Sequence, residues 1–187
     1  MMRSLLGMFL ASLLPAVVLA HESPIDHINR TLTFDVQAKH LRLGYRMNLT
    51  PRVAILQLRK MDRNRDGRIS DNEESGYFET FARRLSSELV FEMNEKRLAV
   101  SVADDVKLYP DLSNEYHFSV SLGSLMKGRH VIQFRDEFSR RYPGSVRLAA
   151  AEPRAGEPIV EIRKDVRRSK RHLDMIEVDL EIAVLEN

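Results

Sequence analysis

The chain lacks cysteine and tryptophan altogether, and neither sign of charge dominates it. Without cysteine among its 187 residues, it can form no disulfide and use no thiol as a nucleophile or metal ligand. The absence of tryptophan, whose flat ring stacks well on ligands, argues against carbohydrate binding. Lys and Arg number 29 against 27 for Asp and Glu, so the chain lacks the positive excess with which nucleic-acid binders neutralise phosphates. We therefore expect no nucleic-acid partner, and a fold held together by packing alone or by packing and a metal ion.

The short motifs of common enzyme classes are also missing. We find no Gly-x-Ser-x-Gly elbow, no phosphate loop, no His-Glu-x-x-His and no glycine-rich nucleotide turn. Asp136 and Glu137 are adjacent acids, but neighbours on a strand point to opposite faces and make no acid/base pair. Together with Arg135, Arg140 and Arg141 they predict a charged surface loop. We expect a protein that is not an enzyme.

One apolar run occurs, at the start of the chain. Residues 5–20 carry no charge, follow Arg3, and are fewer than the ~20 residues that a membrane-spanning helix needs. The run ends in Val18-Leu19-Ala20, which predicts a secretory signal peptide over residues 1–20 and a periplasmic or secreted mature protein. An uncleaved membrane anchor is the alternative. No later segment is apolar enough to span a membrane, so we do not expect the mature chain to do so.

Alternating apolar and polar residues predict short strands along most of the chain. They fall at residues 32–36, 41–49, 89–91, 98–102, 116–122, 130–134, 146–150, 160–162 and 176–184. Seven to nine short strands, with a turn about every ten residues, are typical of an antiparallel, immunoglobulin-like β-sandwich. We expect one such domain over residues 21–187.

A helical insert at about residues 51–88 interrupts these strands. Thr50 as N-cap and Pro51 at the first helical position predict a helix to Met61. A second helix is predicted from about Asp71 to Ser87. Its apolar residues follow the spacing of one helix face, which favours packing on the core over a groove for a partner: Phe78, Phe81, Ala82, Leu85 and Leu89.

Between the two helices, residues 62–73 match the twelve-residue calcium loop of an EF-hand at every position. Calcium takes six to eight oxygen ligands, and Gly67 permits the sharp turn that gathers them. The predicted ligands are the side chains of Asp62, Asn64 and Asp66, the backbone carbonyl of Arg68, Ser70 either directly or through a water, and both carboxylate oxygens of Glu73. An Asp/Asn/Gly-rich turn that binds no ion is the alternative, but it leaves Glu73 at the twelfth position unexplained.

The charges around the loop predict weak binding. Arg59, Lys60, Arg63, Arg65 and Arg68 lie within a few residues of the ligands, and the sequence has no second calcium loop to pair with this one. We expect a dissociation constant of roughly 10⁻⁵–10⁻³ M and an ion that is mainly structural. Magnesium should bind less well, because it demands octahedral geometry at shorter distances.

Three further segments accompany this loop in one known type of domain. They are His21, the run Arg135-Asp136-Glu137-Phe138 and the run Tyr142-Pro143-Gly144. With them, residues 21–150 resemble the exported N-terminal domain of nickel/cobalt-type efflux transporters and related permeases. The resemblance implies a periplasmic accessory domain beside a membrane transporter. It does not imply transport, because no membrane-spanning segment follows here.

Two other features leave alternatives open. After signal cleavage, the amine and imidazole of His21, with His27 or His40, would offer nitrogen ligands to nickel, cobalt or copper, so transition-metal binding or sensing is the alternative function. The segment 163–172 holds six basic side chains besides His172. It suits either a solvated loop, which we favour, or contact with anionic lipid or an acidic partner.

Overall fold

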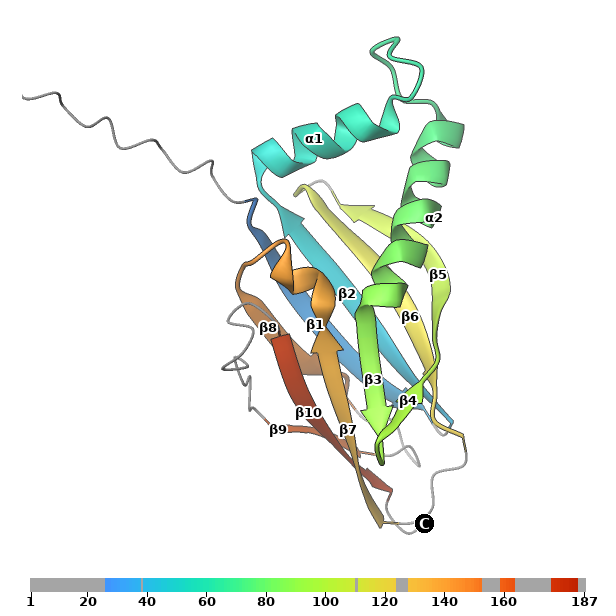
Figure 1. The fold of residues 1–187 in the computed structure, drawn as a ribbon, viewed down its shortest axis with the longest axis vertical. Helices are drawn as coiled ribbons and strands as arrows, with labels where there is room; N and C mark the ends of the chain where they lie inside the picture. The colour runs from blue at the N-terminus through green and yellow to red at the C-terminus, as the bar shows by residue number, and fades with distance from the viewer. Residues whose placement is uncertain are drawn as a thin grey trace, which may run out of the picture.

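The computed structural model describes residues 26–37, 39–109, 111–123, 128–152, 159–163 and 176–184. In these ranges two five-stranded sheets face each other. One helix lies across one end, and the other runs from that end along the first sheet (Figure 1). The predicted fold, mostly β with a helical insert, is confirmed. The predicted signal peptide, His21 and residues 164–172 of the basic segment lie outside the described residues.

The first sheet is nearly all antiparallel. Its strands lie in the order β5 (Val100–Tyr109), β6 (Ser113–Ser121), β2 (His40–Leu49), β1 (Ile28–Gln37) and β8 (Val146–Ala150). The pair β1–β8 runs parallel, with Arg30 opposite Val146, so the predicted antiparallel arrangement holds for every pair of this sheet but this one. Alternating hydrophobicity places a strand on a sheet but does not give its direction, which is why the sequence missed this pair.

The second sheet is antiparallel throughout its described strands. Their order is β4 (Lys96–Leu98), β3 (Leu89–Met93), β7 (Gly128–Asp136), β10 (Ile176–Val184) and β9 (Ile159–Arg163). The turn between β3 and β4 is made by Asn94 and Glu95, with φ of 52° and 62°. Two successive residues with positive φ are typical of the tight turns whose twist matches that of the strands.

The core lies between the sheets. The inward residues of β1, β2 and β6 are buried in alternation, as the period of two predicts. The rings of Phe34 on β1 and Phe134 on β7 meet edge to face with centroids 5.5 Å apart, which joins the two sheets.

The helices connect one sheet to the other. Helix α1 (Pro51–Met61) follows β2, and α2 (Asp71–Glu88) leads into β3. The Thr50 hydroxyl accepts a hydrogen bond from the backbone N–H of Val53 at 3.3 Å, which confirms it as the N-cap. Four of the five residues in the α2 stripe are buried and the fifth, Phe81, is half-buried, so the stripe packs on the core as predicted.

Asp136 does not lie in a charged surface loop, and this expectation was wrong. Its side chain is fully buried where β7 ends, whereas Glu137, the first residue of the short 3-10 helix η1 (Glu137–Arg140), is exposed. The two carboxylates therefore form no pair, as the strand geometry predicts. A buried arginine, Arg30, explains how Asp136 is accommodated.

Candidate metal centre

The predicted calcium loop lies between the two helices at the far end of the molecule from the β3–β4 turn (Figure 1). Helix α1 ends at Met61, one residue before the loop, and the last three loop residues form the first turn of α2. Gly67 has φ of +79°, a conformation that residues with a β-carbon resist. Ile69 packs against the hydrophobic core, so it fixes the loop to the domain as its apolar character predicts.

The side-chain oxygens at the first, third and fifth positions of the loop face its own backbone. Asp62 accepts hydrogen bonds from the N–H groups of Asp66 at 3.1 Å and of Gly67 at 3.0 Å. Asn64 accepts from Asp66 N–H at 2.9 Å, and Asp66 accepts from Arg68 N–H at 2.8 Å. These bonds curl the loop so that the three side chains lie on its inner side.

Glu73 ties the two ends of the loop together. One of its carboxylate oxygens accepts from the backbone N–H of Arg63 at 3.0 Å and of Asn64 at 3.3 Å. The other accepts from Ser70, from the backbone N–H at 3.1 Å and from the hydroxyl at 2.8 Å. The Ser70 N–H, then its hydroxyl, and then the N–H groups of Asn64 and Arg63 lower the pKa of Glu73 from 4.5 to about 2.

Ser70 and Glu73 also form a capping box at the start of α2. The Ser70 hydroxyl accepts from Glu73 N–H at 3.4 Å, while the Glu73 side chain accepts from Ser70 N–H. The spacing Ser-x-x-Glu at the start of an apolar helix is a sequence signal from which this motif can be predicted. Glu73 at the twelfth position therefore has a structural explanation that involves no ion.

The loop offers only oxygen donors, which suits a hard cation. In the described part of the chain, no three His, Asp or Glu side chains are gathered around one point. The loop carboxylates instead accept hydrogen bonds from backbone N–H groups. To hold a cation with both oxygens, Glu73 would have to release at least one of the two donors at each oxygen. The loop thus supplies the predicted oxygen donors in the predicted order, but its carboxylate oxygens accept hydrogen bonds from the loop's own backbone.

Of the histidines considered as alternative ligands, His27 and His40 lie far apart, and His21 lies outside the described residues. His27 precedes β1 and His40 begins β2, so the ten residues of β1 separate them by roughly 30 Å. His117 lies on β6, with its Nε2 atom 3.2 Å from Glu115. His27 and His40 therefore cannot bind the same metal ion within one chain.

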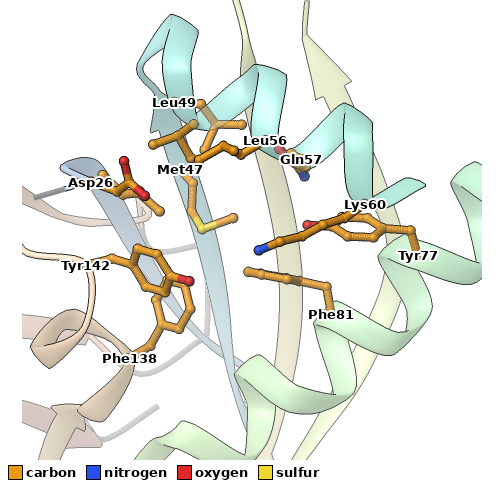
Figure 2. A pocket seen from close by; sticks show the side chains of 12 residues that line it. Asp26, Met47, Leu49, Leu56, Gln57, Lys60, Tyr77, Phe81, Phe138 and Tyr142 are labelled. Carbon is orange, nitrogen blue, oxygen red and sulfur yellow. The ribbon is translucent and has the colours of Figure 1, made fainter. Parts of the chain in front are cut away.

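An aromatic pocket lies beneath α1, one of the two helices that flank the predicted calcium loop (Figure 2). Tyr77 and Phe81 of α2 face Phe138 and Tyr142 across it, and the Lys60 amine points into it from α1. The cavity measures about 50 Å³, enough for a few water molecules at most. We therefore assign it a packing role and no ligand.

Hydrogen bonds beside this pocket hold both helices to the first sheet. Gln57 of α1 accepts from the side-chain amide of Asn114 on β6 at 3.1 Å, and both side chains are buried. Gln57 also forms a hydrogen bond with Tyr77 of α2. Burial raises the pKa of Tyr77 to about 12, so its phenol stays neutral. One amide therefore links α1, α2 and β6.

No protein-family model and no curated protein matches this chain. The resemblance to the exported transporter domain therefore stays a prediction. None of the helices among the described residues is long and apolar enough to cross a membrane.

The two later runs on which the resemblance rests meet in a buried polar network. Asp136 Oδ2 lies 3.3 Å from Arg30 Nε and accepts from the Tyr45 hydroxyl at 2.8 Å. Arg30 also donates to the carbonyl oxygens of Ile28 at 2.7 Å and of Tyr142 at 2.5 Å. The network joins β1 and β2 of one sheet to β7 of the other, so these residues have a structural role here.

Proposed function

We propose that this protein is an exported calcium-binding module, in which residues 62–73 form an EF-hand that holds one ion. The observation that supports this most is the framing of the loop. A helix ends at Met61 and another begins at Asp71, and the sixth loop position is Gly67 with φ of +79°. Twelve residues framed in this way, with oxygen donors at alternate positions, are what a calcium-binding hand requires.

Each proposed ligand has a defined role. Asp62, Asn64 and Asp66 supply oxygens from the first half of the loop, and Arg68 supplies its backbone carbonyl. Ser70 contributes directly or through water, and Glu73 completes the shell with both oxygens. The low pKa of Glu73, about 2, keeps this carboxylate charged at any pH where the protein would work. Protons therefore compete little with calcium for it.

Binding is weak because the loop must give up bonds that it already makes. Glu73 accepts four hydrogen bonds, from Arg63 N–H, Asn64 N–H and both donors of Ser70, and a bidentate ion displaces at least one of the two donors at each oxygen. The exposed Arg63, Arg65 and Arg68 add repulsion. Both effects agree with the range of roughly 10⁻⁵–10⁻³ M that extracellular modules occupy.

The ion is mainly structural in this proposal. The loop lies on the connection from β2 of one sheet to β3 of the other, so an ion that binds only the folded loop stabilises the domain. If the dissociation constant is about 10⁻⁴ M, calcium at about 100 times that value adds about 2.7 kcal/mol to the free energy of unfolding.

Calorimetry of the chain without residues 1–20 tests the proposal. We expect one calcium site per chain and a higher thermal midpoint with millimolar calcium, and both effects should disappear in Glu73→Gln. Glu74→Gln is the matched control, because it removes the same charge one residue away but no ligand, and it should bind calcium nearly as the unaltered chain does. If the unaltered chain gives no heat and no shift of the midpoint, it binds no calcium and the proposal fails.

We propose further that the module works in the periplasm or outside the cell as an accessory to a membrane transporter for metal ions. This part is supported only by the resemblance and by the leader-like first 20 residues. Co-purification of a transporter with the tagged chain from gently solubilised membranes, lost when residues 62–73 are replaced by a Gly/Ser linker, would support it. Nickel or copper binding that disappears on acetylation of the His21 amine would instead favour the transition-metal alternative.

A further inference from the structure

Most of the large exposed apolar side chains among the described residues lie on α1, on β5 or in the turn that follows β5. Six large hydrophobic residues of the described ranges are exposed: Ile55, Leu58, Val102, Leu108, Leu112 and Val131. Leu58, Val102, Leu108 and Leu112 line two hollows beside α2, and Ile55 lies one helical turn from Leu58 on α1. Exposed apolar residues that gather around hollows are typical of a surface that another molecule covers.

The two hollows form one groove, which we call the α2–β5 groove. The first, of about 250 Å³, lies between α1, α2 and the turn from β5 to β6. The second, of about 530 Å³, lies between α2 and β5. Both are lined by Glu74, Phe78 and Leu108, so they are continuous. Along α2 the groove extends from Asp71 to Ala82, about 17 Å at the rise of an α-helix, which is the length of three helical turns.

The rim of the groove is acidic. Asp71, Glu74 and Glu79 of α2 border it. Glu79 is paired with Arg83, whereas Asp71 and Glu74 have no ion-pair partner among the described residues. An occupant with an apolar stripe flanked by positive charge would fit this groove.

Helix α1 of the same chain has this character. It exposes Ile55 and Leu58 one turn apart, carries the exposed Arg59 next to Leu58, and contains no acidic residue. Its 11 residues extend for about 16 Å, which matches the length of the groove. Within one chain, however, α1 forms only the wall of the groove, through Leu58 and Met61.

We propose that a second copy of this chain covers the α2–β5 groove, with α1 of each copy lying in the groove of the other. Leu58 is an exposed residue of α1 and also lines the groove, so the exposed side of α1 and the groove lie on one face of the chain. A two-fold axis near Leu58 therefore allows α1 of each copy to enter the groove of the other. Arg59 of one copy then faces Asp71 and Glu74 of the other. Such an interface uses the same patch twice and closes as a dimer.

Sedimentation equilibrium of the chain without residues 1–20 tests this, from micromolar to millimolar concentration. The buffer contains EDTA, so the result does not depend on calcium binding. We expect a mass twice that of one chain, and a monomer for Leu108→Glu and for Leu58→Glu. Val131→Glu is the matched control, because Val131 is exposed to the same degree outside the groove, and it should remain a dimer. Circular dichroism checks that each variant is folded.

Charge reversal distinguishes this pairing from a non-specific apolar contact. Arg59→Glu and Glu74→Arg should each weaken dimerisation roughly tenfold or more, because each change places like charges opposite one another twice. An equimolar mixture of the two variants should recover the dimer, since in the mixed pair one contact is restored with reversed sign and the other is the native pair of Arg59 and Glu74. A monomer at every concentration, or a dimer that Leu108→Glu leaves intact, would overturn the proposal. So would a monomer that binds a synthetic Leu/Lys amphipathic helix in this groove.

Discussion

Replacing Asp136 by alanine is expected to destabilise the domain severely. The carboxylate is fully buried, 3.3 Å from the guanidinium of Arg30, which is itself 1% exposed. Alanine leaves that positive charge buried without a counter-charge, although Tyr45 and two carbonyl oxygens still accept from it. Removing one partner of a buried ion pair costs about 3–5 kcal/mol. A domain of this size is stable by only about 5–15 kcal/mol, so a large part of its stability would be lost.

Urea unfolding followed by far-UV circular dichroism and by tyrosine fluorescence measures this loss, since the chain has five tyrosines and no tryptophan. Glu137→Ala is the matched control, because it removes the exposed carboxylate next in sequence and should change the free energy of unfolding little. The double variant Arg30→Met with Asp136→Leu should be more stable than Asp136→Ala, because it leaves no charge unpaired. A loss for Asp136→Ala no larger than that of the control would refute this account of the network.

Other expectations concern the loop and one close contact. Gly144→Ala should destabilise the domain by about 1–3 kcal/mol in the same unfolding assay, because a β-carbon there overlaps the carbonyl oxygen of Ile28. Ser70→Ala removes the N-cap of α2 and should cost about 1 kcal/mol, measured against Ser75→Ala on the exposed side of the helix. Gly67→Ala places a β-carbon at φ of +79° and should cost about 1–2 kcal/mol; an unchanged midpoint would show that the loop adopts another conformation. Because the pKa of Glu73 is lowered from 4.5 to about 2, its stabilising contribution is complete above pH 4.5 and lost as the pH falls through about 2. An NMR titration of its side chain, with a midpoint near 4.5, would contradict this.

The helical insert was predictable from the sequence because its signals are local. Thr50 and Pro51 fix the start of α1, and the observed bounds are those predicted. The loop residues from Asp62 to Ser70 connect the two helices, and the last three, Asp71 to Glu73, begin the second helix, as predicted. Whether they bind calcium stays a prediction, since the capping box explains Glu73 without an ion.

The features that the sequence missed depend on contacts between distant residues. The second half of β5 showed no clean alternation because its pairing with β6 shifts register after Val102 and again before Lys107. Asp136 was expected at the surface because charged residues usually lie there, and only the fold brings Arg30 within 3.3 Å of it. The parallel pair β1–β8 likewise follows from the path of the chain between the sheets and not from any local pattern.

The position of the first hairpin has a consequence for how the chain is made. Strands β1 and β2 pair with each other, but their outer neighbours are β8 and β6, which come more than 60 residues later in the chain. Until those segments have been synthesised, the hairpin has two unpaired borders, each able to pair with another polypeptide. The early part of the chain thus depends on the late part for protection against aggregation, and a truncation before Val146 would leave one border permanently open.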